Sequence, residues 1–302
     1  MSVRDREATA ARLLRSSLDH SYEPAIDIDW DAPLAEDLWG IPQHRSSLYG
    51  TALWHDLTEE QRRTLTIHEV CAVARMGLWF EIILMQMLLR YAYDRDPRRP
   101  HIQYALTEIA DECRHSIMFA KMTERYGVPD YAPRVRTHQL GRLFKTIGAG
   151  PAMFAGALIV EEILDQLQRE SMRDETVQPL TRMVNQIHVT EEARHVRYAR
   201  EELIRIMPKI NRRQRAASRW SAARVAYVVA RDLDVQRDGV GRGDVHQTRC
   251  AFCHRISAGP PMMPCSRRNG TSLRADQRSV PCQCGLASAA SRPTAGSMPT
   301  LA

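Results

Sequence analysis

Two short motifs, each a glutamate followed three residues later by a histidine, constrain the fold of this chain more than any other feature. They run from Glu112 to His115 and from Glu192 to His195, and each contains an arginine at its third position. Residues three apart lie about 60° apart around a helix, so both side chains of a motif can face one metal ion. A single motif is weak, because glutamate and histidine are common on solvated helix faces. Two matching motifs predict a pair of metal-binding helices.

The two motifs belong to a longer internal repeat with an offset of 80 residues, which also places Glu81 on Glu161. A constant offset across two helices and their connection indicates a duplicated helix pair, with two similar ligand sets around one centre. The repeat also assigns the metal to Glu161 and not to Glu162, because the counterpart of Glu162 is the apolar Ile82.

The whole pattern is that of ferritin-like carboxylate bundles, in which two helices each give one glutamate and two others each give a Glu-x-x-His pair. Glu81 fits this role because it is the only acidic residue between Glu69 and Asp94 in an otherwise apolar run. A buried carboxylate there would be costly unless it were paired or bound to metal. We therefore predict an all-α, ferritin-like helical bundle with a duplicated helix pair around a dinuclear metal site.

His188 breaks the symmetry of the repeat, because its counterpart is Glu108. It precedes Glu192 by four residues and His195 by seven, so the three share one helix face. We interpret His188 as a further ligand, with a satisfied or surface histidine as the alternative, and Glu108 as part of a solvated face. The predicted metal ligands are Glu81, Glu112, His115, Glu161, His188, Glu192 and His195.

Four carboxylates and three imidazoles, with no thiolate, suit iron or manganese rather than copper or a structural zinc. We predict two iron ions, with manganese as the alternative. Asp111 and Glu191 precede the two motifs at the same offset. They are expected to hydrogen-bond to the histidines, to pair with Arg114 and Arg194, or to be simple solvated charges.

The rest of the chain divides into three parts. Residues 1–57 read as an N-terminal arm with short helical pieces. Residues 58–234 should form the bundle, because they contain long stretches without helix breakers and no sustained two-residue alternation. The expected helices cover residues 58–93, 100–126, 151–174, 179–207 and 211–233.

Residues 235–302 form an atypical tail rich in arginine, cysteine and proline, which we expect to be largely disordered. Its nine arginines and three aspartates account for the whole net charge of +6, so the body is neutral and gives no reason to expect a nucleic-acid partner. Cysteine pairs such as Cys250 and Cys253 could hold zinc, but their spacings match no familiar finger. With no secretory signal and no apolar run of membrane-spanning length, the expected location is the cytoplasm.

Four segments resemble those of the bacterial AurF-like di-iron oxygenases, the p-aminobenzoate N-oxygenase family. They are WFEIILMQMLLR, DECRHSIMFAKM, LIVEEILDQLQRE and HVTEEARHVRYAREEL, and the resemblance covers roughly residues 60–230. The histidine four residues before the second motif, His188, makes the pattern specific to this family. The resemblance implies a seven-ligand di-iron site and N-oxygenation of a small aromatic amine with O2 and an electron donor. A homodimer is compatible with it.

Two other kinds of protein remain as alternatives. A ferritin-like iron-oxidising or peroxide-scavenging protein would use the same ligands without an organic substrate, although the third imidazole suits an oxygenation site better. A non-enzymatic helical protein could keep the site but lose substrate binding through its atypical tail.

Overall fold

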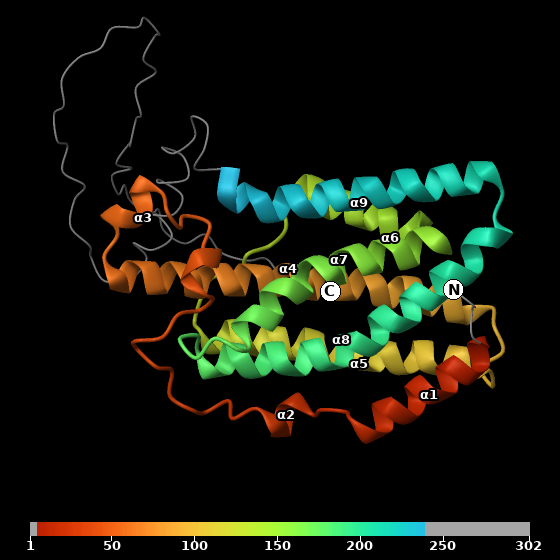
Figure 1. The fold of residues 1–302 in the computed structure, drawn as a ribbon, viewed down its shortest axis with the longest axis horizontal. Helices are drawn as coiled ribbons and strands as arrows, with labels where there is room; N and C mark the ends of the chain where they lie inside the picture. Colours follow the sequence, from red (N-terminus) through yellow and green to blue (C-terminus); the bar gives the residue numbers. More distant parts are fainter. Residues whose placement is uncertain (1–4, 239–302) are drawn as a thin grey trace, which may run out of the picture. The chain divides into compact units, whose positions relative to one another are not determined.

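The computed structural model describes residues 5–238, and their helices are shown in Figure 1. Within that range the chain forms helices and loops without any β-strand, apart from an isolated bridge between Trp39 and Val177. The predicted all-α class is therefore confirmed. In chain order, the elements are α1 (Arg6–Asp19), α2 (Pro24–Asp27), η1 (Gln43–Arg45), α3 (Ala52–Asp56), α4 (Glu59–Tyr93), α5 (Pro100–Arg125), α6 (Val135–Ile147), α7 (Pro151–Ser171), α8 (Pro179–Ile206), η2 (Met207–Lys209) and α9 (Arg212–Asp238).

Helices α4, α5, α7 and α8 form the bundle. Helix α4 packs along α5 and α7 packs along α8, while α5 contacts α8 and α4 contacts α7, an arrangement visible in Figure 1. The internal repeat is also present in the fold, because α8 begins one residue before, and ends one residue after, the bounds that an 80-residue offset from α5 gives. The duplicated helix pair thus consists of α4 with α5 and α7 with α8.

The ends of these helices follow from local chemistry. Thr58 and Gln61 form the reciprocal capping box at the start of α4 that their spacing predicts. Helices α5, α7 and α8 each begin with a proline, whose missing N–H would be unpaired in the first turn anyway. Just beyond α5, Gly127 has φ +64°, a conformation that glycine adopts without strain. These signals fix the lengths of the helices that carry the predicted ligands.

The N-terminal arm is more regular than expected, since α1 spans 14 residues. It packs on α5 and α8, and Arg6 forms an ion pair with the buried Glu202 of α8. Farther along, the backbone of Trp39 accepts from Gln178 N–H at 2.8 Å and donates to the Thr176 carbonyl at 2.9 Å. The arm is therefore held against the rest of the chain near its start and again at Trp39.

Two elements differ from the sequence-based expectation at the C-terminal side. Helix α6 was not predicted; it packs on α4, where Gly141 lies against the Trp79 ring. Helix α9 packs on α7 and continues to Asp238, four residues beyond the expected boundary at residue 234. The remainder of the predicted tail, with its cysteine pairs, lies outside the described residues.

The interior of the bundle combines apolar core clusters with a set of buried polar side chains that includes the predicted ligands. Trp79, Met153 and Phe154 belong to its main core cluster, where their packing is the role that helical spacing favours. Helix α4 is also long and apolar enough to cross a membrane, but core helices of soluble proteins share both properties, so the indication is weak. Glu81, which is 3% exposed, is a buried acid of this helix, as is Glu69 nearer its start.

Candidate metal centre

The structure brings all seven predicted ligands together inside the bundle. Helices α4 and α7 each contribute one glutamate, whereas α5 and α8 contribute the Glu-x-x-His pairs and His188. None of the seven side chains is more than 9% exposed. Burying this many ionisable side chains costs free energy unless they are paired or bind a cation, so the cluster needs such partners.

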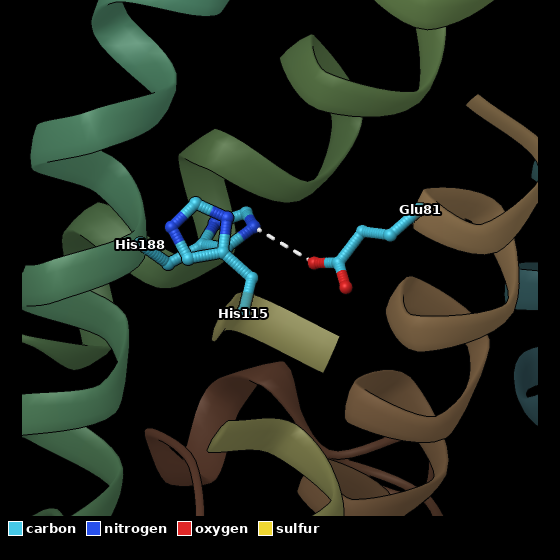
Figure 2. Close-up of side chains that lie close together, drawn as sticks. All are labelled: Glu81, His115 and His188. Carbon is cyan, nitrogen blue, oxygen red and sulfur yellow. Dashed lines mark ion pairs between the residues drawn. The ribbon is translucent and has the colours of Figure 1, made fainter. Parts of the chain in front are cut away.

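Donor atoms in the cluster lie within 4.8 Å of one another in overlapping groups of three. One such group joins Glu81, His115 and His188, which Figure 2 shows facing a common space from three helices. The Nε2 atom of His188 lies 3.4 Å from Oε1 of Glu81. The other groups are Glu108, Glu112 and His195; Glu112, His115 and Glu192; and Glu161, His188 and Glu192.

Glu108 corrects the sequence-based interpretation. It was expected on a solvated helix face, yet its side chain is only 2% exposed and its donor oxygen lies in a group with Glu112 and His195. The reason is its spacing, because Glu108, Glu112 and His115 follow one another at intervals of four and three along α5 and so share the inner face. The sequence carried this signal through the repeat, which pairs Glu108 with His188.

The two motif histidines present the same ring nitrogen to the cluster. Nδ1 of His115 lies 3.3 Å from Glu112, and Nδ1 of His195 lies 2.9 Å from Glu192. Their Nε2 atoms point outward, where Nε2 of His115 is 2.8 Å from Glu191 and Nε2 of His195 is 3.1 Å from Asp111. Each outer carboxylate holds the Nε2–H of a histidine on the opposite half of the repeat. This leaves the Nδ1 lone pair available for a metal ion.

The outer carboxylates also bind the arginines inside the motifs, so both of the interactions considered for them occur together. Arg114 forms an ion pair with Asp111, and Nη2 of Arg194 lies 3.5 Å from Oε1 of Glu191. Burial alone would raise the pKa of Asp111 and Glu191, but hydrogen bonds with the histidines outweigh burial and lower it. Both groups are therefore held as carboxylates.

His188 is held differently. Its Nδ1 lies 2.9 Å from Oε1 of Gln168, an amide oxygen that can only accept, so Nδ1 carries the proton and Nε2 faces Glu81. Gln168 is buried on α7, seven residues after Glu161 and on the same side of that helix. Sequence analysis did not identify Gln168, because its counterpart in the repeat is Leu88 and no motif marks it.

The structure separates the adjacent acids on α7 as the repeat predicts. Glu161 is buried in the cluster, whereas Glu162 is exposed and accepts a hydrogen bond from Arg200 at 2.7 Å. A step of one residue turns a side chain by about 100° around a helix, which accounts for the difference.

The electrostatics are those of a crowded set of acids and imidazoles. Burial raises the pKa of Glu81, and burial with neighbouring carboxylates raises that of Glu161 well above its usual range. Burial would lower the pKa of His115, but hydrogen bonds with Glu112, Glu191 and Glu192 outweigh it and raise it well above normal. Protons therefore occupy the cluster when cations do not, and metal binding would displace them.

Three oxygens of the predicted ligands are buried without a hydrogen-bond partner: Oε1 of Glu81, Oε1 of Glu112 and Oε2 of Glu192. Leaving such atoms unsatisfied costs about 1–3 kcal/mol each, and more when they are charged. Cations between the four helices would satisfy them. Because the donors are carboxylate oxygens and imidazole nitrogens without a thiolate, the residues present fit iron or manganese.

Comparison with known proteins gives a consistent result. The family model described as p-aminobenzoate N-oxygenase AurF matches residues 3–245. The uncharacterized proteins Rv0885 of Mycobacterium tuberculosis and Mb0909 of Mycobacterium bovis are each 32% identical over 217 residues. That alignment covers 68% of this chain but 62% of each relative, so the match spans less than two thirds of their length.

Proposed function

The chain belongs to the p-aminobenzoate N-oxygenase AurF family, a family of di-iron enzymes, and we propose that it is an N-oxygenase. It uses O2 to oxidise the nitrogen of a small aromatic amine, with electrons from a separate donor. The metal ligands are Glu81, Glu112, His115, Glu161, His188, Glu192 and His195. We propose that the protein acts in the cytoplasm.

The observation that carries this proposal is the buried cluster itself. Seven acid and imidazole side chains from four helices meet in the buried interior, and three of their oxygens have no hydrogen-bond partner. Such a site is suited to two divalent ions, because seven donors are too many for one ion and suffice for two if carboxylates are shared. When bound, iron supplies the activation of O2 and the transfer of an oxygen atom to the substrate.

The protein side chains prepare the site for this chemistry. Asp111 and Glu191 hold the outer protons of His195 and His115, so that neither ring has to reorient when a metal ion binds. Ser116 donates to Oε2 of Glu81 at 2.7 Å, and Oε1 of that carboxylate faces His188 without a hydrogen bond. The apolar packing around the cluster excludes bulk water, which protects reactive species from side reactions.

A narrow cavity supports access by O2. It is lined mainly by apolar residues of α4, α5 and α7, and its wall includes Phe119 and Gln168, which both neighbour His188. The Phe119 ring lies 5.0 Å from the His188 ring. Its volume of about 20 Å³ suits a molecule the size of water or O2 and is too small for an aromatic ring.

A larger cavity of about 650 Å³ lies on another side of α4, between that helix, α5 and α6. Its wall includes Ile82 and Trp79, which project about 100° and about 160° around α4 from Glu81. We therefore do not assign the amine substrate to this cavity.

The second candidate is a ferritin-like iron-oxidising or peroxide-scavenging protein, because the same glutamates and motif histidines would serve it. His188 favours the oxygenase. Its ring is buried, tied to Gln168 and directed at Glu81, so a third imidazole is built into the site at the expense of symmetry.

The decisive experiment loads the full chain with Fe(II) without oxygen and then adds p-aminobenzoate, a chemical reductant and ¹⁸O2. Oxygenation predicts an N-oxygenated product that contains ¹⁸O, detected by mass spectrometry, and a panel of other anilines then defines the substrate. The Glu162→Gln variant serves as a positive control, because Glu162 lies outside the cluster. Consumption of O2 with accumulation of many ferric ions per chain, and no labelled product from any arylamine, would instead support the ferritin-like candidate.

A further inference from the structure

We infer that Glu108 is an eighth metal-binding residue and that it makes the two ions of the centre chemically different. The inference rests on the proposed dinuclear site and extends it. Glu108 would bind the ion next to His195, where it takes the place that His188 occupies next to His115. One ion then has two imidazoles nearby, and the other has one imidazole and an additional carboxylate.

The first support is the environment of the Glu108 side chain. It is 2% exposed, and its Oε2 atom is buried without a hydrogen-bond partner. Within residues 5–238, no arginine or lysine forms an ion pair with it. A buried carboxylate of this kind needs a cation or a hydrogen-bond donor, and the donor atoms grouped with its own belong to the predicted ligands Glu112 and His195.

The second support is distance. Donor atoms of Glu108, Glu112 and His195 all lie within 4.8 Å of one another, as do those of Glu81, His115 and His188. Two ligands of one ion must approach each other this closely, because metal–oxygen and metal–nitrogen bonds are each about 2.0–2.2 Å long. By this criterion Glu108 is as close to its neighbouring ligands as His188 is.

The third support is the symmetry of the repeat. The 80-residue offset maps His115 onto His195 and Glu108 onto His188. The pair His115 and His188 lies in one donor group, and the corresponding pair, His195 and Glu108, lies in another. A residue that occupies the position of a ligand, beside the corresponding histidine, is placed to be a ligand itself.

The residues that the repeat pairs as supports for His188 and Glu108 also differ, and the difference suits an imidazole in one half and a carboxylate in the other. Behind His188, Gln168 accepts the proton of Nδ1 and fixes the ring. The counterpart of Gln168 is Leu88, which is fully buried and offers no hydrogen bond. An imidazole needs an acceptor to select its tautomer, whereas a carboxylate that binds a cation does not.

The chemical consequence is unequal charge. A neutral imidazole adds no charge to the ion near His115, whereas Glu108 adds a negative charge to the ion near His195. Oxygen-rich, negatively charged sites favour harder cations, so the site beside Glu108 should bind its ion with a different affinity and give it a distinct spectrum.

The test is a metal titration of the metal-stripped full chain, with Fe(II) in the absence of oxygen, for the wild type and Glu108→Gln. The wild type should bind two ions, with two distinct quadrupole doublets in the Mössbauer spectrum of ⁵⁷Fe(II). Glu108→Gln should keep one ion at wild-type affinity and bind the other at least about tenfold more weakly, with loss of one doublet. Glu124→Gln, an exposed change on the same helix, should match the wild type.

Glu108→Asp provides a second variant that keeps the charge but shortens the side chain. Its affinity for the weaker ion should fall between those of the wild type and Glu108→Gln. Two ions bound at wild-type affinity with two unchanged doublets, in either folded variant, would overturn the role of Glu108. A wild type that binds fewer than two ions would instead refute the proposed dinuclear centre, so the two failures can be told apart.

Discussion

Neighbouring carboxylates of α7 occupy opposite environments and provide a direct test of the site. Glu161 is in the buried cluster, and Glu162 pairs with Arg200 at the surface. Glu161→Ala should therefore bind less than about half of the wild-type iron, because one ion loses a carboxylate ligand. Glu162→Ala should bind the normal amount and lose less than about 0.5 kcal/mol of stability. Iron analysis of both purified variants checks this, and the reverse pattern would show that the register of the repeat is wrong.

His188 and its hydrogen-bond partner Gln168 should act as a unit, in which a change at either residue affects the rate of arylamine oxidation more than the amount of bound iron. His188→Ala is expected to keep a substantial fraction of the iron but to lose most arylamine oxidation. Gln168→Leu, which copies Leu88 of the other half, should reduce oxidation in the same direction and by about tenfold, since the Nδ1–H then loses its acceptor. Gln168→Glu restores an acceptor and should recover activity. Parallel measurement of iron content and product formation separates the two effects, and full activity in Gln168→Leu would contradict the unit.

The residue scale also shows what the sequence could predict about the site. Spacing and the repeat identified the seven residues that the structure brings together. Glu108 was misjudged although the repeat pairs it with His188, because an acidic residue on a helix is usually solvated and its burial depends on the packing of α8. Gln168 could not be found from spacing, because its role comes from a contact with another helix.

At the scale of elements, the helices of the bundle were predictable because their caps and prolines are local signals. Helices α1 and α6 were not, for a physical reason. The apolar stripe of α1 is short, since only Ala10, Leu13 and Leu14 pack against the main core cluster, and its other buried residues are Thr9 and Ser17. Helix α6 contains Gly141 in its middle, which weakens a helix by about 1 kcal/mol relative to alanine, so its formation depends on packing against α4.

That packing leads to a prediction about Gly141. A Cβ at this position would lie 2.3 Å from the Cζ2 atom of Trp79 and 2.8 Å from Cδ1 of Ile83. The Trp79 ring is rigid and buried, so Gly141→Ala should cost about 1–3 kcal/mol of overpacking and exceed the gain of about 1 kcal/mol in helix propensity. The variant should therefore unfold at a lower denaturant concentration than the wild type. Stabilisation would mean that α6 moves away from α4 without cost.

The contact between α1 and α8 gives a pH-dependent prediction. Burial alone would raise the pKa of Glu202, but hydrogen bonds from Arg6 and the charge of Arg205 outweigh burial and lower it. A lowered pKa in the folded state stabilises the protein above the unfolded pKa of about 4.3, and this contribution is lost as the pH falls through the folded value. Arg6→Ala should cost about 2 kcal/mol at pH 7, where a charged hydrogen bond is removed.

The cost of Arg6→Ala should begin to shrink as the pH falls below the unfolded pKa of about 4.3, and should vanish below the lowered pKa of Glu202 in the folded wild type, where this residue is protonated in both proteins. Denaturant unfolding of wild type and variant at several pH values measures this difference. Arg15→Ala, an exposed change on the same helix, provides the control and should show little effect at any pH. A cost for Arg6→Ala that does not depend on pH would indicate lost packing instead of a lost ion pair.

In the molecule as a whole, hydrogen bonds between buried charged side chains join the two helix pairs of the repeat. The outer hydrogen bonds cross between halves, since His115 of α5 reaches Glu191 of α8 and His195 of α8 reaches Asp111 of α5. The cluster thus lies at the seam between α4 with α5 and α7 with α8. Ions in the seam would bind only when both pairs are assembled, so metal binding and folding of the bundle should be coupled.

Metal removal should therefore destabilise the whole protein. A ligand at 100 times its dissociation constant, bound only by the native state, adds about 2.7 kcal/mol. For a domain of 150–250 residues this corresponds to a rise in Tm of about 5–10 °C. Calorimetry of the chelator-treated chain, before and after addition of Mn(II), should show this shift. Mn(II) is the appropriate probe because it binds thiolates poorly and so reports on the carboxylate and imidazole site rather than on cysteines.

Glu161→Ala provides the matched control for this coupling. Its metal-free form should melt at or above the Tm of the metal-free wild type, because the mutation removes a buried acid whose pKa is raised by burial and by neighbouring carboxylates. Mn(II) should then raise its Tm by less than half of the wild-type shift, since one ion has lost a ligand. Equal shifts in the two proteins would place the stabilising metal outside the cluster. No shift in either protein, despite bound Mn(II), would show that folding does not depend on the ions in the seam.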